Sequence, residues 1–300
     1  MIVGCGDIGV RVAQLEKQAG HRVSGLVRSE AGAGRLRGQG IEPVLATLDD
    51  LTSLRDLPTD GKLVYYFAPP TGGGPYDSRM RNFCKAVGGG PLPDKLVYMS
   101  TSGVYGDCGG EWVTEETPLN PQTSRAKRRV DAETTLQEWG REHSVAVVIL
   151  RVTGIYGPGR LPLARIQQGH PVLREDESPP TNRIHADDLA LVCLKAAQKA
   201  VDGDIFNVSD GQPGTMTQYF NRVAELLGLP PLPQVDMDEA KRVMNPMMLS
   251  YLTETRRMNN RKMLDQLGVI LKYPDLESGL KSVIAQMDQP NMGYLGSVGH

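Results

Sequence analysis

A glycine pattern near the N-terminus constrains the fold of this chain more than any other feature. Gly4, Gly6 and Gly9 follow a short apolar run, residues 1–3, and open a stretch whose apolar residues recur with helical spacing. In a GxGxxG turn the glycines permit a tight bend, the approach of a pyrophosphate to the backbone, and close packing of helix on strand. The pattern predicts a dinucleotide site with the phosphates at a helix N-terminus, formed by Gly4, Gly6, Asp7, Ile8 and Gly9.

The run before Gly4 is only three residues long. Either this strand is short or the native chain begins upstream of Met1. A glycine-rich turn without a ligand is the alternative interpretation of the motif. The strand–turn–helix context favours the nucleotide site.

Short β-rich runs alternate with helix-sized stretches, at residues 1–3, 22–27, 42–45, 62–67, 95–100 and 145–150. Such alternation is typical of βαβ units, so we expect an α/β fold with a Rossmann doubly wound parallel sheet. Prolines then interrupt the pattern until a helix near 186–200 and a strand near 205–208. We expect a dinucleotide-binding domain over 1–154 and a smaller substrate-binding lobe over 155–300, with about 183–210 returning to the Rossmann core.

Composition excludes several classes of function. A net charge of −2 argues against nucleic acid or a membrane surface as a partner, because both favour clustered Lys and Arg. No apolar run approaches the roughly 20 residues that span a bilayer, and no leader pattern opens the chain. The four cysteines are far apart and form no CxxC pair, so we expect reduced thiols, no metal site and a cytoplasmic location.

The residue after the second predicted strand bears on the choice of cofactor. Arg28 and Ser29 stand where an NAD-binding fold usually has an acidic residue for the ribose 2′-hydroxyl. A guanidinium suits a 2′-phosphate instead, so we expect NADP, with NAD possible, and a solvated Arg28 as the alternative. The loop that follows the fourth predicted strand, with Ala68 and Pro69, would lie on the cofactor side.

Five segments, in order along the chain, resemble landmarks of one enzyme family. They are 99–106 (SSxxVYG-like), 118–133 (P…PxxxYxxxKxxxE-like), 151–159 (RxxxxYGPG-like), 183–190 (IHxxDxA-like) and 267–280 (closing helix signature). On these motifs the chain resembles an extended or atypical short-chain dehydrogenase/reductase of the epimerase/dehydratase type. The resemblance implies a Rossmann fold, an NAD(P) cofactor and a small-molecule substrate.

The family's catalytic pair is missing. With Pro121 and Glu133 fixing the register, Arg125 falls at the family's Tyr position and Arg129 at its Lys position. An arginine stays protonated at physiological pH, so Arg125 cannot be a general base, although it can donate hydrogen bonds to a substrate oxygen or a phosphate. Losing a positioned acid/base costs roughly 10²–10⁴-fold in rate.

Two other hydroxyl groups are candidates for the chemistry. Thr101 stands at the family's catalytic Ser/Thr position, where it would bind a substrate carbonyl, or it is a strand-end hydroxyl bonded to backbone. Tyr105 is the nearest phenol and would replace the lost acid if a cation lowers its pKa, or it packs against the substrate loop. Ser102 and Gly103 replace the Asp-Glu pair of the family's dehydratases, which argues against dehydration.

The predicted substrate-binding residues are Tyr156, Arg160, Arg183 and His185, in segments that the family uses around its substrate. Together with the two arginines at the Tyr and Lys positions they suggest an anionic substrate, although solvated surface arginines are the alternative. His185 would act as an acid or base, or would tie the lobe to the core while a neighbouring Asp caps the next helix.

Two functions therefore remain open. One is an NAD(P)-binding oxidoreductase or epimerase-like enzyme that acts on a small, anionic metabolite without the usual Tyr-Lys pair. The other is a non-catalytic NADP(H)-binding protein that senses redox state or regulates a partner. We expect a homodimer as a possible assembly in either case.

Overall fold

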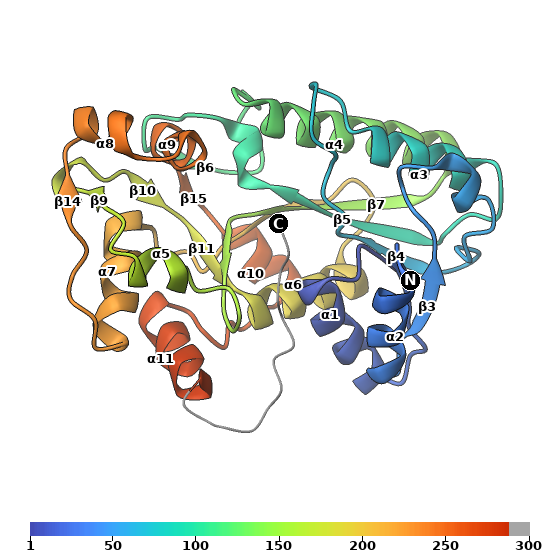
Figure 1. Cartoon of the computed structure of the whole chain (residues 1–300). Coiled ribbons are helices and arrows are strands. Elements are labelled where there is room, and N and C mark those ends of the chain that lie inside the picture. The colour runs from blue at the N-terminus through green and yellow to red at the C-terminus, as the bar shows by residue number, and fades with distance from the viewer. Residues whose placement is uncertain (288–300) are drawn as a thin grey trace.

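The computed structural model describes residues 1–287 and is built on a seven-stranded parallel sheet (Figure 1). The strand order β12-β7-β5-β4-β1-β2-β3 confirms the predicted doubly wound sheet. The strands are β1 (Ile2–Val3), β2 (Ser24–Val27), β3 (Glu42–Leu45), β4 (Leu63–Tyr66), β5 (Lys95–Thr101), β7 (Ala146–Val152) and β12 (Ile205–Val208). All of the neighbouring pairs run parallel.

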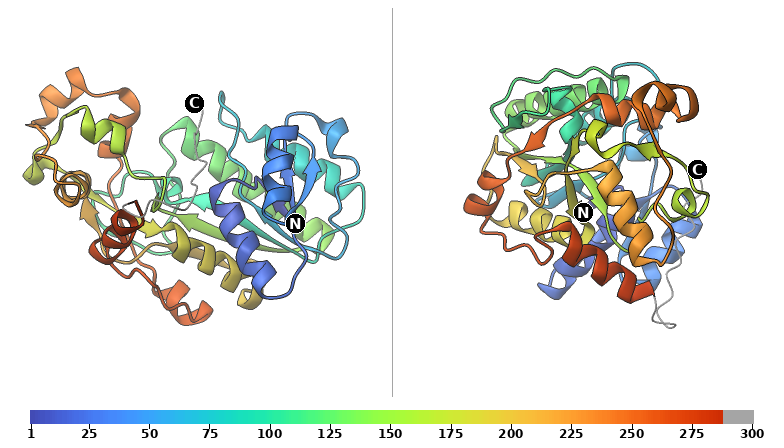
Figure 2. Two further views of the ribbon diagram at one scale, coloured as in Figure 1. Left: turned by 60° about the horizontal axis from the view of Figure 1, so that its bottom comes forward. Right: turned by 90° about the vertical axis from the view of Figure 1, so that its left-hand side faces the viewer.

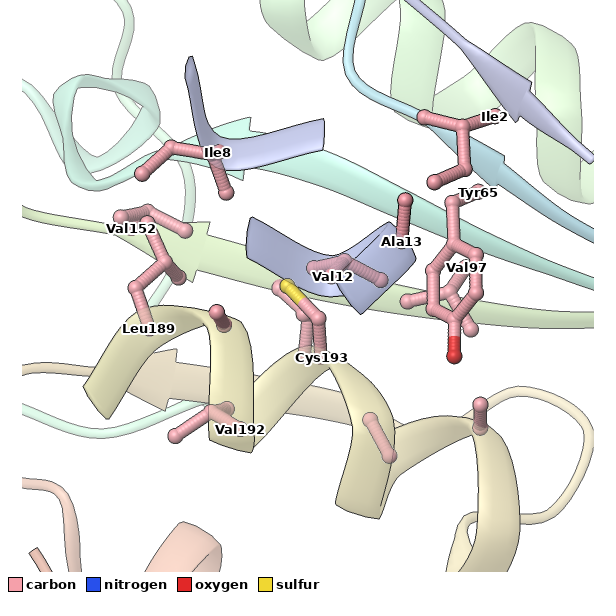
Figure 3. Close-up of a cluster of buried hydrophobic side chains, with 14 of the residues drawn as sticks. Ile2, Ile8, Val12, Ala13, Tyr65, Val97, Val152, Leu189, Val192 and Cys193 are labelled. Carbon is pink, nitrogen blue, oxygen red and sulfur yellow. The ribbon is translucent and has the colours of Figure 1, made fainter. Parts of the chain in front are cut away.

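Helices cover both faces of this sheet, as an all-parallel sheet requires. On one face lie α1 (Asp7–Gln18), α2 (Glu30–Gly38), α6 (Ala186–Lys199) and α10 (Arg261–Leu267). On the other lie α3 (Ser78–Gly88) and α4 (Ser124–His143). Side chains alternate between the faces along each strand: Tyr65 packs on the α1 side, and Val64 and Tyr66 on the α4 side. Figure 3 shows Val12 of α1 beside Cys193 of α6 in the first of these layers.

The first helix ends at a glycine. Ala19 is the C-cap of α1, and Gly20 follows with φ +88°, the left-handed conformation that glycine adopts without strain. The chain then turns directly into β2. The predicted nucleotide motif therefore lies between a strand and a helix whose limits are both set by glycine.

The C-terminal lobe lies beside the carboxyl ends of the sheet strands (Figure 2). Its helices are α5 (Leu163–Gln167), α7 (Met216–Leu226), α8 (Met237–Val243), α9 (Pro246–Thr253) and α11 (Leu276–Met287). Two-stranded pairs join it: β8 (Gly154–Tyr156) with β11 (Arg183–His185), β9 (Val172–Leu173) with β14 (Gln234–Val235), β10 (Pro180–Thr181) with β13 (Gly214–Thr215), and β6 (Trp112–Val113) with β15 (Arg257–Met258). Three short 3₁₀ helices also lie within residues 1–287: η1 (Leu51–Leu54), η2 (Ser102–Tyr105) and η3 (Glu175–Glu177).

Tyr156 holds the last helix against this lobe. Its ring packs on Gly279 of α11 so closely that a Cβ at that glycine would lie 2.0 Å from the Tyr156 hydroxyl. The same hydroxyl donates to the carbonyl of Asp275 at 3.3 Å.

No helix within residues 1–287 has the length and apolar character to cross a bilayer.

Two alanine substitutions should shift stability in opposite directions. Gly279→Ala displaces the Tyr156 ring, so we expect the free energy of unfolding to fall by about 1–3 kcal/mol. Gly34→Ala in α2 meets open space and removes a flexible residue from a helix, so we expect a gain of about 0.5–1 kcal/mol. Urea unfolding of both variants measures this, and equal effects would contradict the packing described for Tyr156.

Candidate functional site

The glycine loop has the form of a phosphate cradle. Gly4 has φ +86°, and a Cβ there would lie 2.5 Å from the backbone nitrogen of Ala68, so the loop after β1 touches the loop after β4. A Cβ at Gly9 would lie 3.1 Å from the Gly4 carbonyl oxygen. A Cβ at Gly6 would instead meet nothing within 4 Å. Packing thus requires Gly4 and Gly9, whereas Gly6 leaves space open in front of α1, where a pyrophosphate fits.

The N-terminus of α1 supports this fit. No side chain caps the helix at Gly6, and first-turn N–H groups have no partner within a helix. Asp7 begins the helix, and its carboxylate accepts from Arg11 at 3.0 Å and from Arg160 at 2.6 Å. The N–H groups of Asp7 and Ile8 and the positive end of the helix are the groups that would hold the cofactor's phosphates.

The adenosine side of the loop carries cations. Arg28 is exposed directly after β2, and the Ser29 hydroxyl accepts from the N–H of Gly32 and caps α2. Arg35, one turn into α2, donates to the carbonyl of Cys5 inside the glycine loop at 3.2 Å. Arg35 was not among the predicted site residues, because its contact with Cys5 joins two different elements and no motif marks it.

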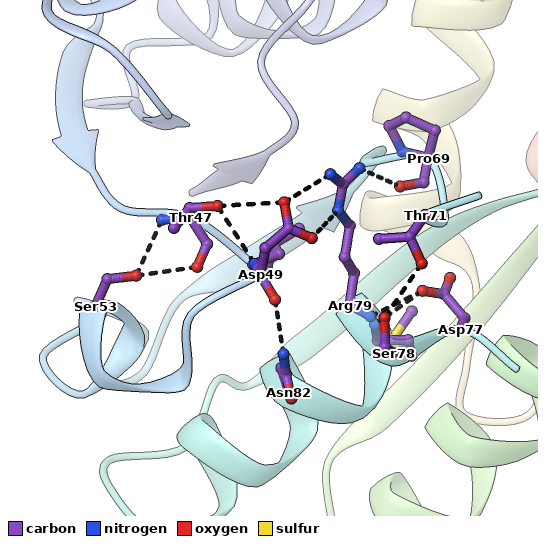
Figure 4. Close-up of polar contacts among 11 residues, drawn as sticks. Thr47, Asp49, Ser53, Pro69, Thr71, Asp77, Ser78, Arg79 and Asn82 are labelled. Atoms are coloured by element: carbon purple, nitrogen blue, oxygen red, sulfur yellow. Dashed lines mark hydrogen bonds and ion pairs between the residues drawn. The ribbon is translucent and has the colours of Figure 1, made fainter. Parts of the chain in front are cut away.

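An ion pair braces the loops after β3 and β4 (Figure 4). Arg79 donates from Nε and Nη2 to both carboxylate oxygens of Asp49, at 2.8 and 2.7 Å, and from Nη1 to the Pro69 carbonyl at 3.1 Å. The neighbouring Asp50 caps η1, since its carboxylate accepts from the N–H of Thr52. No His/Cys/Asp/Glu group within the described part of the chain could hold a metal ion.

A cleft with a volume of about 730 Å³ opens between the sheet and the C-terminal lobe. Among the residues that sequence analysis selected, its lining includes Pro69, Thr101, Arg125, Arg129, Tyr156, Arg160 and Arg183. Tyr105 and His185 are not part of the lining. Thr101 and the four arginines predicted for catalysis and substrate binding therefore line one cleft, whereas Tyr105 and His185 lie outside its lining.

Thr101 and Arg129 lie at the sheet side of the cleft. Thr101 ends β5, and its hydroxyl accepts from the N–H of Gly103 at 3.3 Å. Arg129 donates from Nη1 to the Tyr98 hydroxyl at 3.0 Å and to the Met99 carbonyl at 3.2 Å. Burial opposes its charge, but Tyr98 and the nearby Asp77 carboxylate keep the pKa of Arg129 above its usual value. It is a permanent cation and cannot serve as a base.

Tyr105 is fully buried in a polar network behind the cleft. Its hydroxyl donates to Asn207 at 2.7 Å and accepts from Arg151 at 2.9 Å. Burial raises the pKa of Tyr105 despite the Arg151 charge. The hydroxyl is held by these two partners and is not part of the cleft lining, so this arrangement does not support the predicted proton transfer.

His185 is also fully buried, and it has a structural contact. Its Nδ1 accepts from the N–H of Asp187 at 3.2 Å and caps α6, whereas sequence analysis gave the cap to an Asp. Asp187 instead pairs with Arg11. Burial lowers the pKa of His185 to about 4, so the ring is neutral at pH 7.

The lobe side of the cleft contributes two desolvated arginines. Arg183 is buried, lies 4.3 Å above the Tyr219 ring and forms no ion pair with any residue in 1–287. Arg256, which sequence analysis missed because no motif marks it, donates to the Gly106 carbonyl and lies 3.8 Å from Glu254. Burial lowers the pKa of both guanidinium groups.

The lining of the cleft is strongly basic. Within the described residues its lining holds one acid, Glu254, and six arginines: Arg125, Arg128, Arg129, Arg160, Arg183 and Arg256. Guanidinium groups bind carboxylates and phosphates by paired hydrogen bonds. This arrangement can hold an anionic ligand beside the glycine loop.

Comparison with known proteins agrees with this geometry. A family model described as the NAD dependent epimerase/dehydratase family matches residues 1–209. Protein YeeZ of Escherichia coli (strain K12) is 27% identical over 286 residues, covering 91% of this chain and 96% of that protein. A conserved protein of unknown function from Silicibacter pomeroyi DSS is 28% identical, with a TM-score of 0.79 over 95% of this chain and 97% of that one. The dTDP-glucose 4,6-dehydratase of Bacillus anthracis str. Ames, solved with NAD, shares the fold at 18% identity, with a TM-score of 0.75 over 95% of this chain and 94% of that one.

Gly6→Val tests the cradle. A valine side chain would fill the space in front of α1, so we expect binding of NADPH and NADH to be lost. Because no protein atom lies within 4 Å of the new Cβ, the thermal unfolding midpoint should stay close to that of the wild type. Calorimetric titration measures the binding, and normal affinity in this variant would place the cofactor elsewhere.

Proposed function

This chain belongs to the NAD dependent epimerase/dehydratase family, and we propose that it is an NADP(H)-dependent oxidoreductase or epimerase-like enzyme that acts on a small anionic metabolite. The observation that carries the proposal is the cleft itself, in which six arginines face a single acid beside an open glycine loop. A buried guanidinium without an ion pair, such as that of Arg183, is stabilised when an anion binds.

The cofactor's preference rests on its adenosine side. Arg28 after β2 and Arg35 of α2 supply two cations where a 2′-phosphate would bind, and Arg28 stands directly after β2 where an NAD-binding fold usually has an acidic residue for the ribose diol. When bound, the nicotinamide supplies or accepts the hydride. The protein's part is then to orient a carbonyl or alcohol against it.

Thr101 and the α4 arginines suit that part. The Thr101 hydroxyl and the guanidinium of Arg125 or Arg129 can donate hydrogen bonds to a carbonyl oxygen and stabilise negative charge that develops on it. Tyr105 and His185 are buried outside the cleft lining, and burial raises the pKa of Tyr156 and Tyr219, the two phenols in the lining, which makes them poor substitutes for the family's tyrosine. A reaction in this cleft would take its proton from solvent or from the substrate itself.

Arg183 and Arg256 would bind the anionic group of the substrate at the lobe side. Related folds act on nucleotide sugars, as the name of the Bacillus anthracis dehydratase states. A phosphorylated or carboxylated metabolite is the substrate class that this charge favours.

One observation favours the alternative, a non-catalytic NADP(H)-binding protein. Arg129, at the position of the family's lysine, is tied by hydrogen bonds to Tyr98 and the Met99 carbonyl. A guanidinium held in this way orders the cofactor side of the cleft without taking part in proton transfer. A redox sensor would need this order and no turnover.

Arg28→Ala tests the cofactor preference. The loss of a phosphate-paired arginine should weaken NADPH binding roughly ten- to a hundredfold. NADH has no 2′-phosphate, so its affinity should hardly change. Calorimetric titration of both proteins with both cofactors gives the four constants, and equal wild-type affinities for NADPH and NADH would contradict the preference.

Arg125→Tyr combined with Arg129→Lys tests the catalytic interpretation. The double variant restores the family's pair on a helix whose register is unchanged, so we expect NADPH turnover with simple carbonyl compounds to appear or rise by at least tenfold. Arg141→Lys, in the last turn of the same helix, is the matched control. A silent double variant whose cofactor affinity also stays constant would show that these positions do not act on the nicotinamide, and would favour the sensor.

A further inference from the structure

Arg160 crosses from the C-terminal lobe to the glycine loop. It follows the turn after β8, in which Gly157 has φ +147° and Gly159 φ +73°, and its N–H donates to the Gly157 carbonyl at 3.0 Å. From this turn its Nε reaches Asp7 in the first turn of α1, at 2.6 Å from Oδ2. An ion pair between residues 153 positions apart thus spans the entrance to the dinucleotide site.

Asp7 places a negative charge where a pyrophosphate would add more. The charge is shared by two arginines that differ in their other bonds. Arg11 donates to Asp7 and also to Asp187 of α6, so its guanidinium is held from both sides. Arg160 uses only Nε, and its two terminal amino groups donate to no residue within 1–287. The Arg160 side chain is about one-third exposed (32%) and lines the cleft.

We propose that Arg160 is a cofactor-binding residue supplied by the C-terminal lobe, and that Asp7 is the positioning residue that aims it at the pyrophosphate. The inference rests on the proposed function only in that a dinucleotide binds at the glycine loop. Nε stays on Asp7, while the two terminal amino groups are free to donate to phosphate oxygens. Arg160 also offsets the repulsion between the Asp7 carboxylate and the phosphates.

The two partners of this ion pair should then have opposite effects on affinity. Arg160→Gln removes the phosphate donors and leaves Asp7 with less compensation, so the cofactor should bind more weakly. Asp7→Asn keeps an oxygen that accepts from Nε and removes the repelling charge, so the cofactor should bind equally well or more tightly. A pair with only a structural role would give the same sign in both variants, or no effect in either.

Calorimetric titration of the full chain with NADPH and NADH distinguishes these cases. We expect Arg160→Gln to weaken both dinucleotides about tenfold or more, and Asp7→Asn added to it to recover part of the loss. Arg174→Gln is the matched control, because Arg174 forms a similar surface pair with Asp236 away from the cleft. Thermal unfolding checks that each variant is folded.

The outcomes separate this inference from the proposed function. A wild type that binds neither dinucleotide overturns both. A wild type that binds, with Arg160→Gln binding equally well, overturns the role of Arg160 alone. Equal weakening by Arg160→Gln and Asp7→Asn would also overturn it, because it would show that the pair acts only by holding the loop.

Discussion

A buried ion pair between Glu133 and Arg151 sets the geometry on which the cleft depends. Arg151 on β7 donates to both Glu133 oxygens, and the side chains are only 5% and 3% exposed. The Ser100 hydroxyl donates to the same carboxylate. Removing one partner of a buried ion pair typically costs about 3–5 kcal/mol, because the other charge is left buried and uncompensated. Helix α4 is therefore fixed in one register against the sheet.

That register decides which side chains of α4 enter the cleft. Arg125, Arg129 and Glu133 are spaced by four residues, so they form one stripe along the helix. Glu133 binds Ser100 of β5 and Arg151 of β7, and the two arginines of the same stripe line the cleft. The same ion pair also fixes Tyr105, because Arg151 donates a hydrogen bond to the Tyr105 hydroxyl. The interaction that places Arg125 and Arg129 in the cleft also holds the Tyr105 hydroxyl outside its lining.

The extent to which the sequence predicted the site follows from the range of the forces involved. The glycine loop and Thr101 were predicted because strand–turn–helix geometry is local, and a turn at a strand end has few solutions. The buried position of Tyr105 was not, because it depends on Arg151 and Asn207, 46 and 102 residues away. Spacing along an element places a side chain on a face of that element. It does not identify the partner on another element. The ion pair between Arg79 and Asp49 was not predicted for the same reason.

Arg183 shows how the fold keeps a cation ready for a ligand. Its guanidinium lies over the face of the Tyr219 ring and donates to the Thr215 carbonyl at 3.4 Å, while burial raises the pKa of the nearby Asp210 to about 7 despite the Arg183 charge. Because its pKa is raised, Asp210 offsets the guanidinium charge less than an ordinary carboxylate would. A fully ionised carboxylate beside Arg183 would compensate its charge within the protein and would weaken its attraction for a ligand anion. A cation–π contact stabilises a desolvated charge by about 2 kcal/mol or more, and it leaves the guanidinium N–H groups able to donate to another acceptor. An anion that enters the cleft would accept charge-assisted hydrogen bonds from Arg183, which is why we propose the lobe side as the place where the substrate's charge binds.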